Sequence, residues 1–310
     1  MPRVLVASKI SEKAVDLLRS RGFEVDVVVE PPPERLAQII GEYDAIIVRG
    51  KPLITREVLR NARRLKLIVR AGVGLDNIDV QAAKEMGIEV ANTPAATTQS
   101  VAELAVGLML AALRKIALVD RRMREGEWPK HEAVGSELQG KVVGIVGYGR
   151  IGRAVARIVS RGFGARVIFT DSHCRPGSVD EETGATCADL DALLREADIV
   201  TLHVPLTNET RHMIDERRLR MMKRTAILIN TSRGAVVDTE ALVRALREGW
   251  IAGAGLDVYE EEPLPKGHPL TQLDNVVLTP HVGANTGEAQ DRAGIEAAEI
   301  VSRFFSEKGG

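Results

Sequence analysis

The chain has 310 residues, which is long enough for two domains that each bury their own core. Hydrophobic residues make up 45% and charged residues 27%, a balance typical of globular proteins. With 42 basic and 43 acidic residues the net charge is −1, so no global field attracts nucleic acid or an anionic membrane. The N-terminus shows no signal-peptide pattern, and the most apolar stretch, residues 101–113, is too short to span a bilayer. We therefore expect a cytoplasmic protein that binds neither nucleic acid nor membrane.

Short apolar, β-branched runs alternate with amphipathic helical patterns along almost the whole chain. The expected strands are Arg3–Ala7, Glu24–Val29, Ala45–Val48, Lys66–Val69, Glu89–Ala91, Lys141–Val146, Ala165–Thr170, Asp198–His203, Ala226–Asn230, Gly253–Val258 and Asn275–Thr279. The helical patterns between them include Ser11–Arg21, Thr55–Asn61, Arg150–Val159, Asp189–Glu196 and Thr239–Glu248. Such alternation predicts parallel sheets with helices on both faces. Eleven strands exceed the usual size of one such sheet, so we expect an α/β fold with two doubly wound parallel sheets.

A domain division is expected near residues 93–94, where a turn precedes the longest helical pattern, residues 100–124. Trp128 begins an extended stretch after that helix. The chain has two cysteines, Cys174 and Cys187, which is too few for a disulfide framework or a metal cluster. We interpret both as small apolar residues and expect no metal site.

A glycine motif follows the strand pattern KVVGIV and precedes a helical pattern. Gly147 would permit a tight turn, Gly149 would let backbone N–H groups approach a diphosphate, and Gly152 would let helix and strand pack closely. The same glycines could form an ordinary turn. Their position between a strand and a helix favours a dinucleotide site instead.

The residue that ends the next strand pattern indicates which dinucleotide is bound. Asp171 lies nineteen residues beyond Gly152, where a carboxylate can accept hydrogen bonds from both adenosine ribose hydroxyls and would repel a 2′-phosphate. We therefore expect NAD. His173 and Arg175 could accept the extra phosphate of NADP, but we interpret them as solvated loop residues.

Three polar residues come shortly after later strand patterns. Arg233 follows Ala226–Asn230, Glu262 lies in the acidic run after Gly253–Val258, and His281 follows Asn275–Thr279. Each by itself could be an ordinary surface or loop residue. Because the carboxyl ends of parallel strands bind ligands in open α/β sheets, the three together predict an acid–base pair with an anion clamp.

The motifs VRG, RAGVGLDNID, NTP, AEL, HVPLT, NTSRGAVVD, AGAGLDV, EEP and TPHVGA, together with the glycine motif, span nearly the whole chain. In this combination the chain resembles the D-isomer-specific 2-hydroxyacid dehydrogenases, and within them most closely the phosphoglycerate dehydrogenase branch. The resemblance implies two Rossmann-like domains with a cleft between them. It implies a discontinuous substrate domain of residues 1–97 and 284–310, an NAD domain of residues 98–283, and a homodimer built on the long helix and the arm around Trp128.

The resemblance also implies roles for single residues. His281 exchanges the proton of the substrate's 2-hydroxyl, Glu262 orients His281 and favours its imidazolium form, and Arg233 holds the substrate carboxylate. Backbone N–H groups of Val73 and Gly74 contact the same carboxylate. His203 is interpreted as part of the cofactor wall, and Asp257 as the partner of the nicotinamide carboxamide. The complete set of implied NAD contacts is Gly147, Gly149, Arg150, Ile151, Gly152, Asp171, Val204, Thr231, Ser232, Asp257, Gly283 and Ala284.

The expected substrate follows from two arginines that come after apolar strand patterns. Arg49 and Arg70 match phosphate-binding positions of the phosphoglycerate dehydrogenase branch, with Lys51 near the first. We therefore expect NAD-dependent oxidation of 3-phospho-D-glycerate to 3-phosphohydroxypyruvate, the first step of phosphorylated serine biosynthesis.

Two departures from that branch leave other activities open. The chain has Gly50-Lys51-Pro52 after the first arginine and Ala95-Ala96-Thr97 after NTP. A glyoxylate or hydroxypyruvate reductase of the same family is therefore an alternative. Formate dehydrogenase is disfavoured, since that branch lacks the glutamate present here as Glu262. A further alternative belongs to another functional class, the non-catalytic proteins that bind NADH. Corepressors that associate with partner proteins when NADH is bound share this fold and these motifs.

Overall fold

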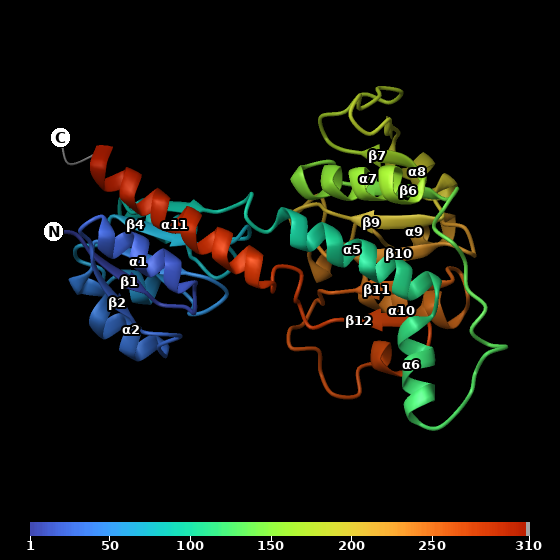
Figure 1. Ribbon diagram of the computed structural model, residues 1–310, viewed down its shortest axis with the longest axis horizontal. Helices are drawn as coiled ribbons and strands as arrows, with labels where there is room; N and C mark the ends of the chain where they lie inside the picture. The colour runs from blue at the N-terminus through green and yellow to red at the C-terminus, as the bar shows by residue number, and fades with distance from the viewer. Residues whose placement is uncertain (308–310) are drawn as a thin grey trace. The chain divides into compact units, whose positions relative to one another are not determined.

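The computed structural model describes residues 1–307 and divides into two compact units (Figure 1). Unit 1 contains Met1–Thr98 and the described residues from Ala284 onward, and unit 2 contains Gln99–Gly283. The family resemblance implied a discontinuous first domain of residues 1–97 and 284–310 and a second domain of residues 98–283, and this division stays a prediction. Residues 308–310 of the predicted first domain lie outside the described residues.

Unit 1 is built on a parallel five-stranded sheet with the order β2-β1-β3-β4-β5. Its strands are β1 (Arg3–Val6), β2 (Glu24–Val27), β3 (Ala45–Val48), β4 (Leu67–Arg70) and β5 (Glu89–Asn92). Its helices are α1 (Glu12–Ser20), α2 (Pro33–Ile39), α3 (Arg56–Leu59), α4 (Val80–Glu85) and α11 (Gly287–Glu307), with a 3-10 turn η1 at Ile40–Glu42.

The C-terminal helix α11 packs on this sheet beside α1. Along β1, Val4 and Val6 belong to the cluster that includes Ala14 of α1 and Ala297 of α11. Leu5, which points to the opposite face, belongs to the cluster on the other side of the sheet. The return of the chain's end to the first domain, which only the family resemblance implied, is thus part of the apolar core.

Unit 2 is built on a seven-stranded sheet with the order β12-β11-β10-β9-β6-β7-β8, and every neighbouring pair is parallel. Its strands are β6 (Val142–Val146), β7 (Arg166–Thr170), β8 (Thr186–Cys187), β9 (Ile199–Leu202), β10 (Ile227–Asn230), β11 (Gly253–Leu256) and β12 (Val276–Leu278). Its helices are α5 (Thr98–Leu113), α6 (Ile116–Arg124), α7 (Arg150–Phe163), α8 (Leu190–Glu196), α9 (Glu216–Met221) and α10 (Thr239–Arg247), with 3-10 turns η2 (Gly234–Val236) and η3 (Pro269–Gln272).

The strand order reverses between β6 and β9. The chain runs from β6 outward to β7 and β8, and then returns to place β9 on the other side of β6. At such a reversal the loops that follow the two strands run in opposite directions and leave a crevice at the carboxyl ends of the strands. Open α/β sheets bind their ligands in this crevice. The glycine motif follows β6 directly, so the fold places it at this point.

The single long helix predicted for residues 100–124 is wrong, because the structure divides it into α5 and α6. Lys115 between them has a φ of +54°, which ends the first helix. The carbonyl of Leu113 accepts the N–H of Ser136 at 3.0 Å, from the extended stretch that returns past the end of α5. This contact between distant parts of the chain could not be read from helical periodicity.

The interpretation of the two cysteines is also wrong. Cys174 and Cys187 form a disulfide, with Cα atoms 6.3 Å apart. Cys187 lies in β8, a two-residue edge strand that was too short to be predicted, and it pairs with Phe169 of β7. Within residues 1–307 no helix is long and apolar enough to cross a membrane.

Candidate active site

Three neighbouring strands of unit 2 each lead into a residue of the predicted catalytic set. β10, β11 and β12 are adjacent and parallel, so their carboxyl ends lie along one edge of the sheet. Arg233 follows β10, Glu262 follows β11 and His281 follows β12. The topology therefore collects at one edge the three residues that the sequence singled out.

His281 and Glu262 form a direct pair. Nδ1 of His281 lies 2.7 Å from Oε2 of Glu262, and the two side chains are 52% and 36% exposed. The other carboxylate oxygen, Oε1, accepts the backbone N–H of Tyr259 at 3.0 Å, so the carboxylate is held through both oxygens. Because Nδ1 is engaged, Nε2 is the ring nitrogen that can exchange a proton with a substrate.

Asp257 holds the loop that carries His281. Its Oδ1 accepts the hydroxyl of Thr279 at 2.6 Å and the N–H of Val282 at 2.9 Å, and its Oδ2 accepts the N–H of Gly283 at 2.9 Å. Asp257 is 1% exposed, and His281 has a φ of +52°, a costly conformation for a residue with a side chain. This geometry supports a positioning role for Asp257, and the implied contact with the nicotinamide carboxamide stays a prediction.

Gly234 lets the loop of Arg233 pass directly against the loop of Glu262. A Cβ on Gly234 would lie 1.9 Å from the carbonyl carbon of Tyr259 and 2.3 Å from the nitrogen of Glu260. No larger residue fits there without moving backbone, so the glycine sets the spacing of the two loops. Sequence reasoning missed this role, because nothing in the linear pattern shows that these loops touch.

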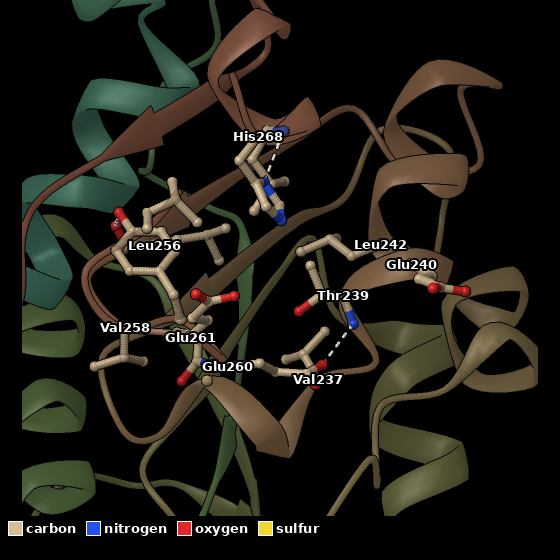
Figure 2. Close-up of a pocket in the computed structure, with 14 residues that line it drawn as sticks. Val237, Thr239, Glu240, Leu242, Leu256, Val258, Glu260, Glu261 and His268 are labelled. Atoms are coloured by element: carbon tan, nitrogen blue, oxygen red, sulfur yellow. Dashed lines mark hydrogen bonds between the residues drawn. The ribbon is translucent and has the colours of Figure 1, made fainter. Parts of the chain in front are cut away.

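A pocket of about 210 Å³ lies beside the same two loops (Figure 2). Its lining includes Gly234, Val237, Thr239, Glu240, Tyr259, Glu260, Glu261 and His268, but neither Glu262 nor His281. Glu260 Oε1 accepts the N–H of Thr239 at 3.0 Å and lies 3.3 Å from Nε2 of His212. Burial raises the pKa of Glu260, but these bonds outweigh burial and leave the pKa lowered, so Glu260 anchors the loop as a carboxylate.

The glycine motif fits a dinucleotide diphosphate. Gly147 has a φ of +91°, and a Cβ there would lie 2.8 Å from the carbonyl carbon of His203. A Cβ on Gly152 would lie 2.2 Å from the carbonyl oxygen of Gly147, so the packing of the chain itself requires both glycines. Gly149 differs, since no heavy atom lies within 4 Å of its Cβ position. The space beside Gly149, at the start of α7, is therefore open, and a helix N-terminus favours a diphosphate there.

Asp171 lies against the glycine loop. Its Oδ2 accepts the N–H of Tyr148 at 2.8 Å, and its Oδ1 accepts the N–H of His173 at 3.2 Å. These bonds fix the carboxylate beside the motif. Its contact with the adenosine ribose stays a prediction. Arg150 in the same motif is exposed, and Ile151 is partly buried.

Thr231 and Ser232, which follow β10, are each 9% exposed. Ser232 Oγ bonds to Asn230 at 2.9 Å, whereas Oγ1 of Thr231 is buried and lacks a hydrogen-bond partner within residues 1–307. Buried hydroxyls are seldom left without a partner, so this atom fits a contact with a bound cofactor.

His203 and Val204 pack directly against Gly147 of the glycine loop. A Cβ on Gly147 would lie 2.9 Å from Cγ1 of Val204, and Nε2 of His203 lies 2.9 Å from Oγ1 of Thr201. Burial lowers the pKa of His203 to about 3, so its imidazole is neutral near pH 7. A neutral imidazole supports its interpretation as a wall residue rather than as a second proton donor.

The predicted substrate residues of unit 1 follow β3 and β4. Arg49 donates from Nη2 to the carbonyl of Ala284 at 3.0 Å, and burial lowers the pKa of Arg49. The guanidinium of Arg70 lies over Gly72, where a Cβ would meet Nη1 at 1.6 Å. The segment Val73-Gly74 comes next in that loop, with Val73 40% exposed. Arg49 therefore has a partner within its own unit, the backbone of Ala284.

The glycine motif and the His281–Glu262 pair lie in a segment that matches a known family model. Residues 106–283 match the NAD-binding domain of the D-isomer-specific 2-hydroxyacid dehydrogenases. A glyoxylate reductase from Thermococcus litoralis is 46% identical over 97% of this chain and 92% of its own length. The chain belongs to the D-isomer-specific 2-hydroxyacid dehydrogenase family. It is accordingly an enzyme of the NAD-dependent 2-hydroxyacid dehydrogenase class.

Solved structures agree with this assignment. The TT0316 protein from Thermus thermophilus is 42% identical, with a TM-score of 0.87 over 96% of this chain and 94% of its own. A D-lactate dehydrogenase from Aquifex aeolicus, solved with NAD and lactic acid, is 32% identical, with a TM-score of 0.81 over 98% and 96% of the two chains. The predicted α/β fold with two parallel sheets and the predicted cofactor, NAD, are confirmed.

The predicted substrate, 3-phosphoglycerate, is wrong. A D-3-phosphoglycerate dehydrogenase from Methanocaldococcus jannaschii is 45% identical, but the chain spans only 58% of that relative's length. Relatives named glyoxylate reductase are more numerous among those compared, and at 44–46% identity they match over 90–94% of their length. The phosphate prediction depended on Arg49 and Arg70, with Lys51 nearby, and the guanidinium of Arg49 binds backbone within unit 1. An arginine after an apolar strand is therefore not by itself a phosphate ligand.

Proposed function

We propose that this family member is a glyoxylate reductase, which reduces glyoxylate, and with it the similar 2-oxo acid hydroxypyruvate, to the 2-hydroxy acid. The observation that carries the chemistry is the 2.7 Å contact between Nδ1 of His281 and Oε2 of Glu262. The relatives named glyoxylate reductase, which match over almost their whole length, support the choice of substrate.

The proposed reaction needs a proton donor and an anion clamp from the chain. The hydride would come from reduced NAD when it is bound. His281, protonated and oriented by Glu262, gives the proton from Nε2 to the oxygen that becomes the 2-hydroxyl. Arg233 holds the substrate carboxylate, for which its planar fork is suited. The N–H groups of Val73 and Gly74 remain proposed contacts of that carboxylate, on the family resemblance alone.

The cofactor contacts are proposed on the same basis. The open space at Gly149 suits the diphosphate, Asp171 the adenosine ribose, and the unpartnered hydroxyl of Thr231 a further polar group of the cofactor. Asp257 is proposed to fix the position of His281, since its carboxylate oxygens accept hydrogen bonds from residues on both sides of that histidine.

A homodimer belongs to the same proposal. Helix α6 buries none of its residues, and apolar side chains of this helix and of the arm that follows it are exposed. Trp128 is 76% exposed and Val134 is 74% exposed. Large apolar side chains left exposed are expected on a surface that is covered by another chain.

An NADH-linked assay with glyoxylate, hydroxypyruvate, phosphohydroxypyruvate and pyruvate tests the proposed activity. We expect the highest kcat/KM with glyoxylate. A preference for phosphohydroxypyruvate or pyruvate of about tenfold or more would assign the chain to another branch. NADH binding without turnover of any of the four would favour the NADH-dependent binding protein that the sequence left open.

A further inference from the structure

The segment between β7 and β8 begins at the residue proposed to bind the adenosine ribose. Asp171 follows β7 directly, and fourteen residues then lead to β8, the edge strand that holds Cys187. Residues 172–179 are exposed except for Cys174. Backbone hydrogen bonds of 2.8 Å join Gly177 and Ser178 in the middle of the segment to Cys187 of β8. The disulfide at Cys174 is the link to β8 that lies nearest to Asp171.

The disulfide fastens the start of this segment to the sheet. Cys174 lies three residues after Asp171, and its bonding partner Cys187 pairs in register with Phe169 of β7. The turn between Asp171 and Cys174 also has the hydrogen bond from Cys174 N–H to the carbonyl of Asp171, at 3.2 Å. The N–H of His173 within this turn bonds to Oδ1 of Asp171. The disulfide therefore holds the turn that orients the Asp171 carboxylate.

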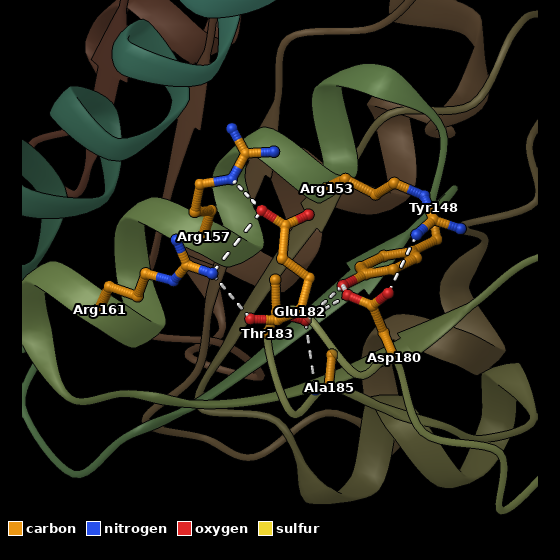
Figure 3. Close-up of polar contacts among 8 residues, drawn as sticks. All are labelled: Tyr148, Arg153, Arg157, Arg161, Asp180, Glu182, Thr183 and Ala185. Carbon is orange, nitrogen blue, oxygen red and sulfur yellow. Dashed lines mark hydrogen bonds and ion pairs between the residues drawn. The ribbon is translucent and has the colours of Figure 1, made fainter.

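The far end of the segment is fastened to the glycine loop and to α7 (Figure 3). The hydroxyl of Tyr148 lies 2.9 Å from Asp180 and 2.7 Å from Thr183. Arg153 of α7 pairs with Asp180 at 3.0 Å. Three residues of α7 in all, Arg153, Arg157 and Arg161, reach the segment through Asp180 or Glu182.

Tyr148 contacts both ends of the segment, Asp171 at its start and Asp180 near its other end. The ring of Tyr148 stacks on Phe169 with centroids 3.9 Å apart, and its N–H bonds to Oδ2 of Asp171 at 2.8 Å. Burial raises the pKa of Tyr148 to about 12, so its phenol stays protonated and can donate to Asp180. The glycine loop, Asp171 and the disulfide-closed segment are thus one connected structure.

We propose that the Cys174–Cys187 pair is a reversible redox site that sets the affinity of the chain for NAD. With the disulfide closed, the turn from Asp171 to Cys174 is ordered before the cofactor binds. With the disulfide reduced, binding must order this exposed turn, and the affinity falls. The inference depends on NAD binding, which the family assignment provides, and not on the proposed substrate.

The redox step is a thiol–disulfide exchange with a dithiol reductant. A thiolate of the reductant attacks Sγ of Cys174, the less buried of the two residues, and the electron pair of the broken S–S bond leaves on Sγ of Cys187, which takes up a proton. The second thiolate of the reductant then displaces Sγ of Cys174, which is protonated in turn. The reductant becomes a disulfide, and the protein gains two electrons and two protons.

The test compares NADH binding by the oxidised and the reduced protein. Because the chain has only these two cysteines, alkylation and mass spectrometry report the state of this pair alone. NADH fluorescence titration without any 2-oxo acid gives Kd for each state, and thermal unfolding gives Tm. We expect a Kd about threefold to tenfold higher after reduction with dithiothreitol, and a return to the first value after reoxidation. Failure of the glyoxylate proposal would not affect this measurement, because no substrate is present.

The double variant with Cys174→Ser and Cys187→Ser is the matched control. It should bind NADH like the reduced protein and should not respond to dithiothreitol. Equal Kd values with a lowered Tm would show that the disulfide is structural only and would overturn the proposal. Free thiols in the air-oxidised protein, or a response to dithiothreitol in the double variant, would overturn it as well. If the double variant does not fold, the oxidised and reduced forms of the unmodified chain still decide.

Discussion

Nδ1 of His281 lies 2.7 Å from Oε2 of Glu262, although the two residues follow different strands and are separated by 19 positions. Other residues fix the position of each member of the pair. Asp257 binds the loop on the C-terminal side of His281, and the N–H of Tyr259 binds the second oxygen of Glu262. A general acid needs such support, because its reacting nitrogen has to meet the substrate in a fixed direction.

Replacement of this histidine should remove the proposed acid. We expect His281→Ala to lower kcat by about a hundredfold or more, while the Kd for NADH changes by about twofold or less. Steady-state kinetics with glyoxylate and NADH fluorescence titration measure the two effects. His131→Ala, which changes an exposed histidine of the arm, is the control and should leave both values unchanged. Near-normal turnover in His281→Ala would remove His281 from the mechanism.

The spacing between the loops of Arg233 and Glu262 can be tested at Gly234. A methyl group there would meet the backbone of Tyr259 at 1.9 Å, so Gly234→Ala has to move one of the loops. We expect a loss of about 1–3 kcal/mol in unfolding free energy and a fall of at least about tenfold in kcat.

Gly162→Ala in α7 is the matched control for this substitution. No heavy atom lies within 4 Å of the Cβ position of Gly162, and alanine is the better helix former, so this variant should be neutral or more stable by up to about 1 kcal/mol. Chemical denaturation and glyoxylate kinetics on both variants give the comparison. A Gly234→Ala enzyme with normal kcat would show that the loop spacing does not matter for catalysis.

The general architecture could be predicted from the sequence because it depends on local pattern. Alternating strand and helix patterns predicted parallel sheets, and eleven of the twelve strands of the described residues were expected close to their observed positions. The missed strand, β8, has two residues and owes its position to pairing with β7. The break at Lys115 and the disulfide likewise depend on contacts between segments distant in the sequence.

In the candidate site too, local patterns were predictable from the sequence and contacts between distant segments were not. Arg233, Glu262 and His281 were predicted because each follows a strand, and neighbouring parallel strands end together. Gly234 and Tyr148 were not predicted to matter, since their roles come from loops that touch in space. The substrate was predicted wrongly for a related reason. The charges of Arg49 and Arg70, on which that prediction rested, are visible in the sequence, but the bond of Arg49 to the carbonyl of Ala284 is not.

Asp171 should make the enzyme prefer NADH to NADPH. Its carboxylate is fixed beside the glycine loop by the N–H groups of Tyr148 and His173, where it would repel a 2′-phosphate. We expect Asp171→Ala to lower the ratio of kcat/KM with NADH to kcat/KM with NADPH by about tenfold to a hundredfold. This factor corresponds to the free energy of a hydrogen bond to a charged group. Asp191→Ala, at a surface ion pair with Arg217, should leave the ratio unchanged. Equal use of both cofactors by the unmodified enzyme would contradict this prediction.

His203 should make the folded protein less stable in acid. Burial lowers its pKa to about 3, from 6.5 for a histidine in water. Between these values the unfolded chain binds a proton that the folded chain does not, so the unfolding free energy falls as the pH drops below 7. A fully buried group would contribute about 1.4 kcal/mol per pH unit. Because His203 as a residue keeps partial exposure, we expect a contribution of about 1 kcal/mol between pH 7 and pH 5.

The measurement for this prediction is urea denaturation at pH 7 and pH 5, on the unmodified chain and on His203→Gln. The variant has no group that titrates at this position, so its unfolding free energy should fall by about 1 kcal/mol less than that of the unmodified chain. Equal losses would mean that the imidazole can take up a proton in the folded state.

The proposed dimer can be tested through the exposed apolar residues of α6 and the arm. Ile116 and Met123 of α6 are 50% and 46% exposed, and Trp128 in the arm is 76% exposed. Burial of such side chains contributes about 1.5–3 kcal/mol each, so the loss of one large side chain should weaken association by at least about tenfold. Sedimentation at micromolar concentration should show a dimer for the unmodified chain and a shift toward monomer for Trp128→Ala.

Val29→Ala is the control for the dimer experiment, because Val29 is also exposed, at 52%, but lies in unit 1. It should sediment like the unmodified chain. If the unmodified chain sediments only as a 33.7 kDa species, the dimer is wrong. If Val29→Ala dissociates and Trp128→Ala does not, two chains still associate, but through unit 1 rather than through α6 and the arm.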